Sequence, residues 1–132
     1  MALDVGNVRI GVAASDPTQT ISTPLNSLTR KNSIPEIKEI CSDRGIVLIL
    51  VGMPYLPSGK LGTQARITEA FINELKISTE IPIRTADERM TTIEAKKRLK
   101  ESGYKNTSKA GNKGIIDSAA AAVLLDEYIS SL

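Results

Sequence analysis

The sequence predicts an α/β fold built on a mixed central β-sheet with helices on both faces. Two short apolar runs separated by a glycine–asparagine pair open the chain, and this pattern predicts an antiparallel hairpin. A continuous apolar run of strand length follows near the middle of the chain, as expected for a central strand buried on both faces. Segments with helical spacing then alternate with strand-like segments, which is typical of α/β folds with parallel strands.

The first elements are predicted to form an antiparallel β-meander. Met1–Gly6 and Arg9–Ala14 are rich in Val, Leu, Ile and Ala, and Gly6-Asn7 between them tolerates the positive φ of a tight turn. A third extended segment lies within Thr20–Leu28. Pro24 predicts an edge position for this segment, because proline cannot donate a ladder hydrogen bond.

Helices and strands alternate in the rest of the chain, which at 132 residues fits a single domain, 1–132, without repeat or linker. Ser33–Glu36 resembles a capping box that opens a helix, and Ile46–Val51 is the central apolar strand. The remaining predicted elements are an amphipathic helix around Ile67–Leu75, a strand at Ile81–Thr85, a helix that begins with a second capping box at Thr91–Glu94 and ends near Gly103, and a helix from Ile115 to Ser130.

Composition excludes several kinds of chemistry. The chain has no histidine, so histidine-based triads and zinc sites with histidine ligands are excluded. Cys41 is the single cysteine, and the resulting lack of an internal disulfide suits a cytoplasmic location. No apolar run approaches the roughly 20 residues that span a membrane. Catalysis would therefore depend on carboxylates, lysine, hydroxyl groups or a metal ion held by oxygen ligands.

Positive charge is concentrated in one segment of the sequence. Residues 96–113 contain seven lysines and arginines against one glutamate, a net charge of +6, whereas the whole chain carries only +2. Such a segment could contact a phosphate backbone. It could also be a solvated helix face and loop kept soluble by its lysines.

Carboxylates occur at three places where a ligand or a partner is expected. Asp4 lies in an apolar strand just before a turn, where burial disfavours its charged form. Asp87 and Glu88 follow a strand end, the usual ligand-binding position of an α/β sheet. Asp117 shares one face of the last helix with alanine and leucine. Each acid also has an ordinary explanation, namely a hydrogen-bonded turn, a solvated loop, or the positive end of a helix dipole.

Taken together, the acids match the requirements of one mechanism. Two-metal hydrolysis of phosphodiesters uses several carboxylates to hold Mg²⁺ or Mn²⁺ ions about 3.5–4 Å apart. Oxygen ligands without histidine or paired cysteines favour Mg²⁺ or Mn²⁺ over zinc. Four cations are candidates for binding substrate phosphate, although each arginine could instead form a surface ion pair. These cations are Arg9, Lys60, Arg89 and Lys113.

Four motifs resemble those of the YqgF/RuvX family. They are DVGNVRIGVA from Asp4 to Ala13 with Ser15-Asp16, VGMP from Val51 to Pro54 with Gly59, DERMTT from Asp87 to Thr92, and KGIIDSAA from Lys113 to Ala120. The motifs follow the family's order across nearly the whole chain, and the segment before Asp4 is shorter than usual in the family. Jointly they are highly specific.

The resemblance implies an RNase H-like fold with an acidic metal site at Asp4, Glu88 and Asp117, with Asp87 as the alternative to Glu88. The family is described both as Holliday-junction resolvases and as nucleases that mature the 5′ end of pre-16S rRNA. We therefore expect a Mg²⁺- or Mn²⁺-dependent nuclease acting on structured RNA or branched DNA, and we favour the ribosomal role. Aromatic residues make up 3% of the chain, so recognition through shape and phosphate is expected rather than base stacking.

Two other functions compete with this hypothesis. The chain could be a non-catalytic nucleic-acid-binding module in which residues 96–113 provide affinity and the acids are structural. It could also be a small phosphotransferase, because actin-like kinases share an RNase H-like core, but these need two domains around a nucleotide. The sequence leaves open whether the protein is a monomer or a homodimer, and a resolvase acting on a symmetric junction would be a dimer.

Overall fold

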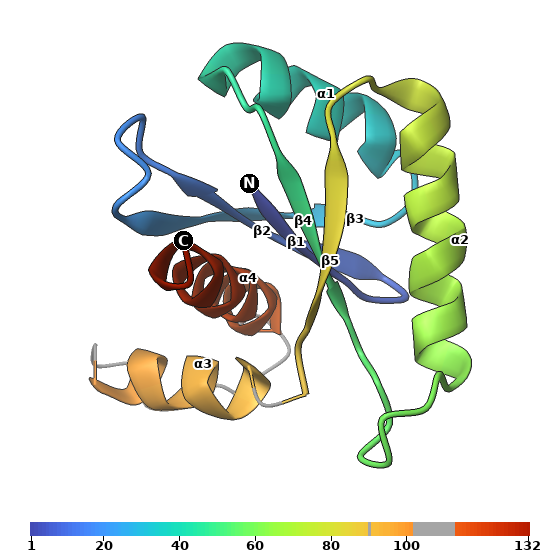
Figure 1. Ribbon diagram of the computed structural model, residues 1–132, viewed down its shortest axis with the longest axis vertical. Helices are drawn as coiled ribbons and strands as arrows, with labels where there is room; N and C mark the ends of the chain where they lie inside the picture. Colours follow the sequence, from blue (N-terminus) through green and yellow to red (C-terminus); the bar gives the residue numbers. More distant parts are fainter. Residues whose placement is uncertain (90, 102–112) are drawn as a thin grey trace.

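The computed structural model describes residues 1–89, 91–101 and 113–132, without the side chains of residues 91–93 and 113. Within these ranges the elements follow the predicted order βββαβαβαα (Figure 1). The strands are β1 (Ala2–Val5), β2 (Arg9–Ser15), β3 (Ser22–Thr29), β4 (Ile49–Met53) and β5 (Ile83–Asp87). The helices are α1 (Ser33–Arg44), α2 (Thr63–Ser78), α3 (Thr91–Glu101) and α4 (Lys113–Ser130).

The described strands form one mixed sheet in the order β3-β2-β1-β4-β5. β1, β2 and β3 pair antiparallel as the predicted meander, and β3 lies at an edge with Pro24 opposite Ala13. β1, β4 and β5 are parallel to one another. All five residues of β4 are buried, as predicted for a central strand. The prediction of a mixed α/β sheet is confirmed.

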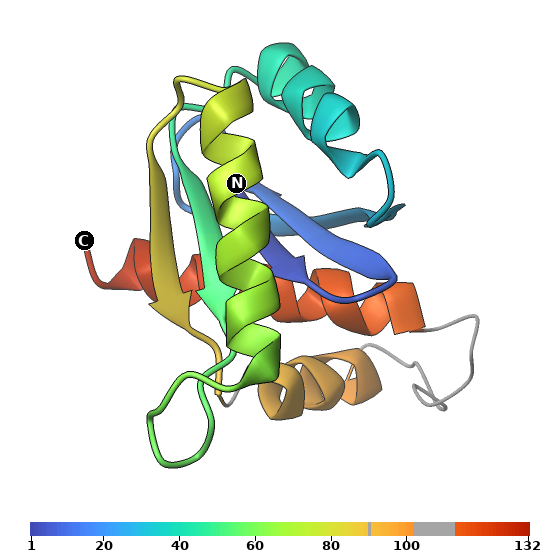
Figure 2. The ribbon, with the colours of Figure 1, turned by 90° about the vertical axis from the view of Figure 1, so that its right-hand side faces the viewer.

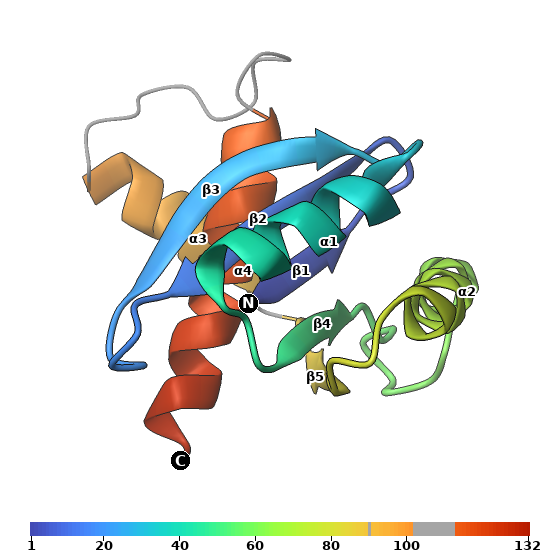
Figure 3. The same ribbon diagram turned by 90° about the horizontal axis from the view of Figure 1, so that it is seen from above.

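Helices cover both faces of the sheet (Figures 2 and 3). α1 and α2 bury one core cluster against the sheet, which includes Leu3, Val51 and Phe71. α4 covers the opposite face, where small side chains such as Ala121 let the helix lie close to the strands. α3 packs on α4 and contributes Leu99 to a third cluster. None of the helices in the described ranges combines the length and apolar character needed to cross a bilayer.

The structure corrects the predicted start of α1. Ser33 is the first residue of the helix and not its cap, and Asn32 occupies the cap position with a φ of 62° and no capping side-chain hydrogen bond. The Ser33 side chain is buried, and its hydroxyl donates to the Arg30 carbonyl oxygen at 2.8 Å. The preceding loop therefore takes the hydroxyl that the capping box would have used.

Two strands begin later than their apolar residues predicted. β4 starts at Ile49 rather than Ile46, and β5 starts at Ile83 rather than Ile81. Pro82 has no amide hydrogen to donate to a ladder, and its carbonyl accepts the Ile49 amide at 3.0 Å. Both strands also end later than predicted, β4 at Met53 and β5 at Asp87, where the acidic motif begins.

Candidate active site

Three parallel strands bring the acidic motifs to the side of the sheet where these strands end, which we call the carboxyl edge. The carboxyl ends of β1, β4 and β5 meet at this edge, which is the usual ligand-binding edge of an α/β sheet. Asp4 lies near the end of β1, directly opposite Gly11 of β2. Asp87 ends β5, and the next amide, that of Glu88, donates to the Met53 carbonyl at 3.3 Å. The ladder therefore continues as far as Glu88.

The alternation of side chains along the strands separates Glu88 from Asp87. Ala2 and Ala86 both pack in the cluster beneath α4. Because residues two apart on a strand share a face, Asp4 and Glu88 also point toward α4. Asp87 points the other way, toward solvent. Of the two acids that the sequence left as alternatives, Glu88 is therefore the one that faces Asp4.

Asp4 and Glu88 are joined by a hydrogen bond between their carboxyl groups. Burial raises the pKa of Asp4 to about 6, against a lowering by the bond to Glu88. Burial, followed by the charge of Asp4, raises the pKa of Glu88 to about 9. The pair therefore shares a proton near neutral pH, with Glu88 as the donor and the Asp4 carboxylate as the acceptor.

Asp117 approaches this pair from the first turns of α4. Its negative charge raises the pKa of both Asp4 and Glu88, so the three predicted acids lie within electrostatic reach of one another. Asp117 Oδ2 also accepts a hydrogen bond from Arg9 Nε at 3.3 Å, in an ion pair whose two side chains are about one-third exposed. The structure thus brings Asp4, Glu88 and Asp117 together, with Arg9 beside them.

The donor atoms at this edge suit a hard divalent cation, but their present arrangement is incomplete. In the ranges that the structure describes, no three acidic or cysteine side chains are arranged to hold a metal ion. Asp4 and Glu88 are hydrogen-bonded to each other, while the Asp117 carboxylate is engaged by Arg9. Coordination by Asp4 and Glu88 together would require the shared proton to leave. Their oxygen chemistry fits Mg²⁺ or Mn²⁺.

Two glycines allow the close approach of the acidic groups. A Cβ atom on Gly11 would lie 2.1 Å from the backbone of Asp117, so α4 packs directly against the main chain of β2. A Cβ atom on Gly52 would lie 2.2 Å from Glu88 Oε2, so the Glu88 carboxyl occupies the space above β4. Both glycines face α4 and leave the room that the carboxyl groups need.

Ser118 fixes the beginning of α4 on the sheet, a role that was not predicted from the sequence. Its buried hydroxyl accepts the backbone amide of Val12 at 3.2 Å, where the pairing of β2 with β3 is irregular. This contact orients the helix turn that carries Asp117. The run of four alanines after Ser118 was an available signal, because small residues indicate a helix packed closely on a sheet.

We expect Gly11→Ala to lower the free energy of unfolding by about 1–3 kcal/mol, the usual cost of overpacking a dense interface. The added methyl group would meet the backbone of Asp117, which cannot move without displacing α4. Gly52→Ala is the matched comparison, because its methyl group would meet the movable end of the Glu88 side chain. Urea denaturation measures both variants. Equal stabilities would contradict the rigid packing of α4 on β2.

The four predicted substrate-binding cations lie in different settings. Arg9 is paired with the acid of α4. Arg89 is paired with Asp87 at 2.6 Å, and this pairing lowers the pKa of that carboxyl group. Lys60 is exposed in the loop between β4 and α2. Lys113 begins α4, and its side chain lies outside the described residues. Among the predicted cations whose side chains the structure describes, Arg9 is the one that lies beside Asp117.

Comparison with known proteins identifies the family. The family model described as "RuvX: Holliday junction resolvase" matches residues 1–131, a span that contains all four sequence motifs. The chain belongs to the RuvX family. Membership in RuvX confirms the resemblance found in the motifs, and the mixed sheet with helices on both faces is consistent with the RNase H-like fold that RuvX membership implies.

Curated proteins similar to this RuvX chain match it almost end to end. A protein of Microcystis aeruginosa (strain NIES-843 / IAM M-2473), named "Putative pre-16S rRNA nuclease", is 35% identical over 98% of this chain and 89% of the relative. A protein of the same name from Nostoc sp. (strain PCC 7120 / SAG 25.82 / UTEX 2576) is also 35% identical, over 98% of this chain and 85% of its own length. One from Rhodococcus erythropolis (strain PR4 / NBRC 100887) is 39% identical over 98% of this chain and 76% of its own length.

Proposed function

We propose that this chain is a metal-dependent nuclease that hydrolyses phosphodiester bonds in structured nucleic acid, with maturation of the 5′ end of pre-16S rRNA as its role. The observation that carries the proposal is the meeting of Asp4 and Glu88, with Asp117 beside them, at the carboxyl edge of the sheet. The names of the relatives support an RNA substrate. The family description supports a branched DNA junction as the alternative.

In this proposal Asp4, Glu88 and Asp117 would hold Mg²⁺ or Mn²⁺. The support is the donor set, which consists of carboxyl oxygens, and the raised pKa values of Asp4 and Glu88, which reflect burial and the repulsion of neighbouring acids. A bound cation would offset that repulsion. When bound, it would supply a positive charge that activates water and stabilises the charge developing on the phosphate oxygens.

The cations of the chain would orient the substrate in this proposal. Arg9 and Arg89 are each held by one carboxylate, and their side chains stay partly exposed. A phosphate can accept two parallel hydrogen bonds from a guanidinium group, which fixes its orientation as well as its position. Lys60 is exposed on the loop that follows β4 and would add a point charge nearer solvent. Lys113 completes the proposed set from the start of α4.

A cleavage panel tests the proposed function. Precursor 16S rRNA 5′ fragments and four-way DNA junctions would be incubated with the protein in Mg²⁺, Mn²⁺ or EDTA. We expect cleavage of the RNA fragment at a defined position that needs either cation and stops in EDTA. Symmetric cleavage of the junction with the RNA left intact would assign the resolvase activity instead. Failure to cut either substrate in either metal would contradict a nuclease.

A further inference from the structure

The solvent side of α3 carries three exposed lysines, Lys96, Lys97 and Lys100. Ala95 and Leu99 are buried on the inner side of the same helix. Positions separated by three and four residues are neighbours on a helix surface, with Cβ atoms about 5–6 Å apart, so the lysines form one continuous group. None of them is ion-paired within the part of the chain that the structure describes. We call this group the α3 lysine face.

The acids of α3 do not neutralise this face. Glu94 Oε1 accepts a hydrogen bond from Arg98 Nε at 3.4 Å, so Glu94 forms an ion pair with an arginine of the same helix. Glu101 is exposed at the end of α3 as the structure describes it. The α3 lysine face therefore keeps a net positive charge, whereas the whole chain carries only +2.

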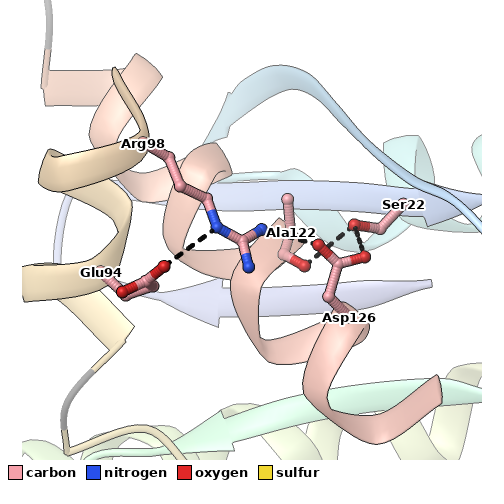
Figure 4. Close-up of polar contacts among 5 residues, drawn as sticks. All are labelled: Ser22, Glu94, Arg98, Ala122 and Asp126. Carbon is pink, nitrogen blue, oxygen red and sulfur yellow. Dashed lines mark hydrogen bonds and ion pairs between the residues drawn. The ribbon is translucent and has the colours of Figure 1, made fainter. Parts of the chain in front are cut away.

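A network of polar contacts holds α3 in a fixed position (Figure 4). Arg98 donates to Asp126 Oδ2 of α4 at 2.6 Å. Ser22 of β3 donates to Asp126 Oδ1 at 2.6 Å and to the Ala122 carbonyl oxygen at 3.0 Å. One arginine thus ties α3 to α4, and through Asp126 to the edge strand. The three lysines therefore lie on a helix whose orientation is fixed by its core packing and by these polar contacts.

α3, the helix that carries the lysine face, begins close to the acidic residues. α3 begins at Thr91, three residues after Glu88. Its inner side packs against Ala119, Ala120 and Val123 of α4, which follow closely on Asp117. Figures 1 and 2 show α3 alongside α4, near the point where the chain leaves β5. A long polyanion seated at the acidic residues can therefore continue along α3.

We propose that the α3 lysine face binds the backbone phosphates of a nucleic-acid duplex arm adjacent to the bond that is cleaved. Three flexible ammonium groups on a convex helix do not form a pocket for one small anion, but they match a series of regularly spaced phosphates. Such contacts provide affinity and orientation without reading sequence. The inference rests on the proposed function, because it assigns a second contact surface to the same substrate.

Binding measurements in EDTA test the proposal separately from cleavage. Fluorescence anisotropy would follow a labelled RNA hairpin with a duplex stem over a range of salt concentrations. The matched control removes the same charge elsewhere on the molecule. It replaces three exposed lysines that lie in the loop before α1, in α1 and in α2. The test variant is Lys96→Gln/Lys97→Gln/Lys100→Gln, and the control is Lys31→Gln/Lys38→Gln/Lys76→Gln.

We expect the test variant to bind roughly 100-fold more weakly at about 0.1 M salt, and the slope of log K against log salt to become shallower by roughly 2–3, since each lost phosphate contact removes about 0.9. The control should bind within about threefold of the wild type, because the change in net charge alone acts weakly through screened distances. Thermal unfolding at wild-type temperatures would show that both variants fold.

Unchanged affinity and slope in the test variant would contradict the proposal that the α3 lysine face binds phosphates. An equal loss of affinity in the control variant would contradict it as well. The cleavage panel then distinguishes the two proposals. If the wild type cuts RNA in Mg²⁺ and the test variant cuts with the same KM, the nuclease stands and the lysine face fails. If the wild type cuts nothing but binds through these lysines, the lysine face stands and the nuclease fails.

Discussion

Glu88→Gln should reduce metal-dependent cleavage at least about 1000-fold while the chain stays folded. Glutamine keeps the size of the side chain and can still donate a hydrogen bond to Asp4, as the protonated Glu88 does. It loses the negative oxygen that would bind the cation. Single-turnover cleavage of the precursor RNA fragment in saturating Mg²⁺ measures the loss. Circular dichroism and thermal unfolding measure whether the fold is kept.

Asp87→Asn is the matched control for this substitution. It makes the same chemical change one residue earlier, on the side chain that points away from Asp4 and is paired with Arg89. Its cleavage rate should stay within about tenfold of the wild type, because it frees the exposed Arg89, which can still contact phosphate, and leaves the Glu88 carboxyl group in place. A large loss in Asp87→Asn with a small loss in Glu88→Gln would transfer the ligand role to Asp87 and contradict the alternation argument.

The face of Asp4 could be predicted from the sequence, because the apolar Leu3 and Val5 on either side of it belong to the opposite core. The choice between Asp87 and Glu88 could not be made in the same way. Alternation assigns a face only while the backbone stays extended, and the sequence did not show that the ladder continues to Glu88. The deciding contact is the Glu88 amide with the Met53 carbonyl, which joins two strands far apart in sequence.

The place of Asp117 in the site also depends on a contact that no local pattern encodes. Helical spacing predicted that Asp117 faces inward, and the structure confirms that α4 packs with this side toward the sheet. Which strand it meets is set by Gly11, 106 positions earlier, whose missing side chain admits the backbone of α4. The four motifs predicted the position of Asp117 better than local patterns did, because members of one family share a fold and therefore its long-range contacts.

The failed capping box shows a different limit of sequence reasoning. Ser33 and Glu36 have the spacing of a cap, and either a cap or a first helical turn satisfies that pattern. The preceding chain decided between them, because the Ser33 hydroxyl binds the Arg30 carbonyl and Asn32 takes a left-handed conformation. The residue at which a helix begins depends on such loop contacts and is harder to predict than the existence of the helix, which apolar spacing indicates.

In the absence of divalent metal, the protein should become less stable as the pH rises from 6 to 9. Unfolded carboxyl groups release their protons near pH 4, whereas the folded pair holds protons until the pH reaches about 6 at Asp4 and about 9 at Glu88. Between these limits the folded state binds more protons than the unfolded state. The stability that the pair contributes is thus complete below pH 4 and is lost as the pH rises through the two folded values.

The loss should be at most about 1.4 kcal/mol per pH unit for one proton, and smaller because water still reaches both groups. Glu88→Gln removes the titration with the higher pKa. Urea denaturation at a series of pH values gives the stability of the wild type and of this variant, and the difference between them is the contribution of the pair without that of other titrating groups. Mn²⁺ should take the place of the proton, stabilising the wild type by about 2.7 kcal/mol at 100 times its Kd at pH 8 and less at pH 6. The variant should gain much less. If both proteins show the same pH dependence and the same gain from Mn²⁺, then Asp4 and Glu88 neither share a proton nor bind the cation, and the acids at this edge would be structural.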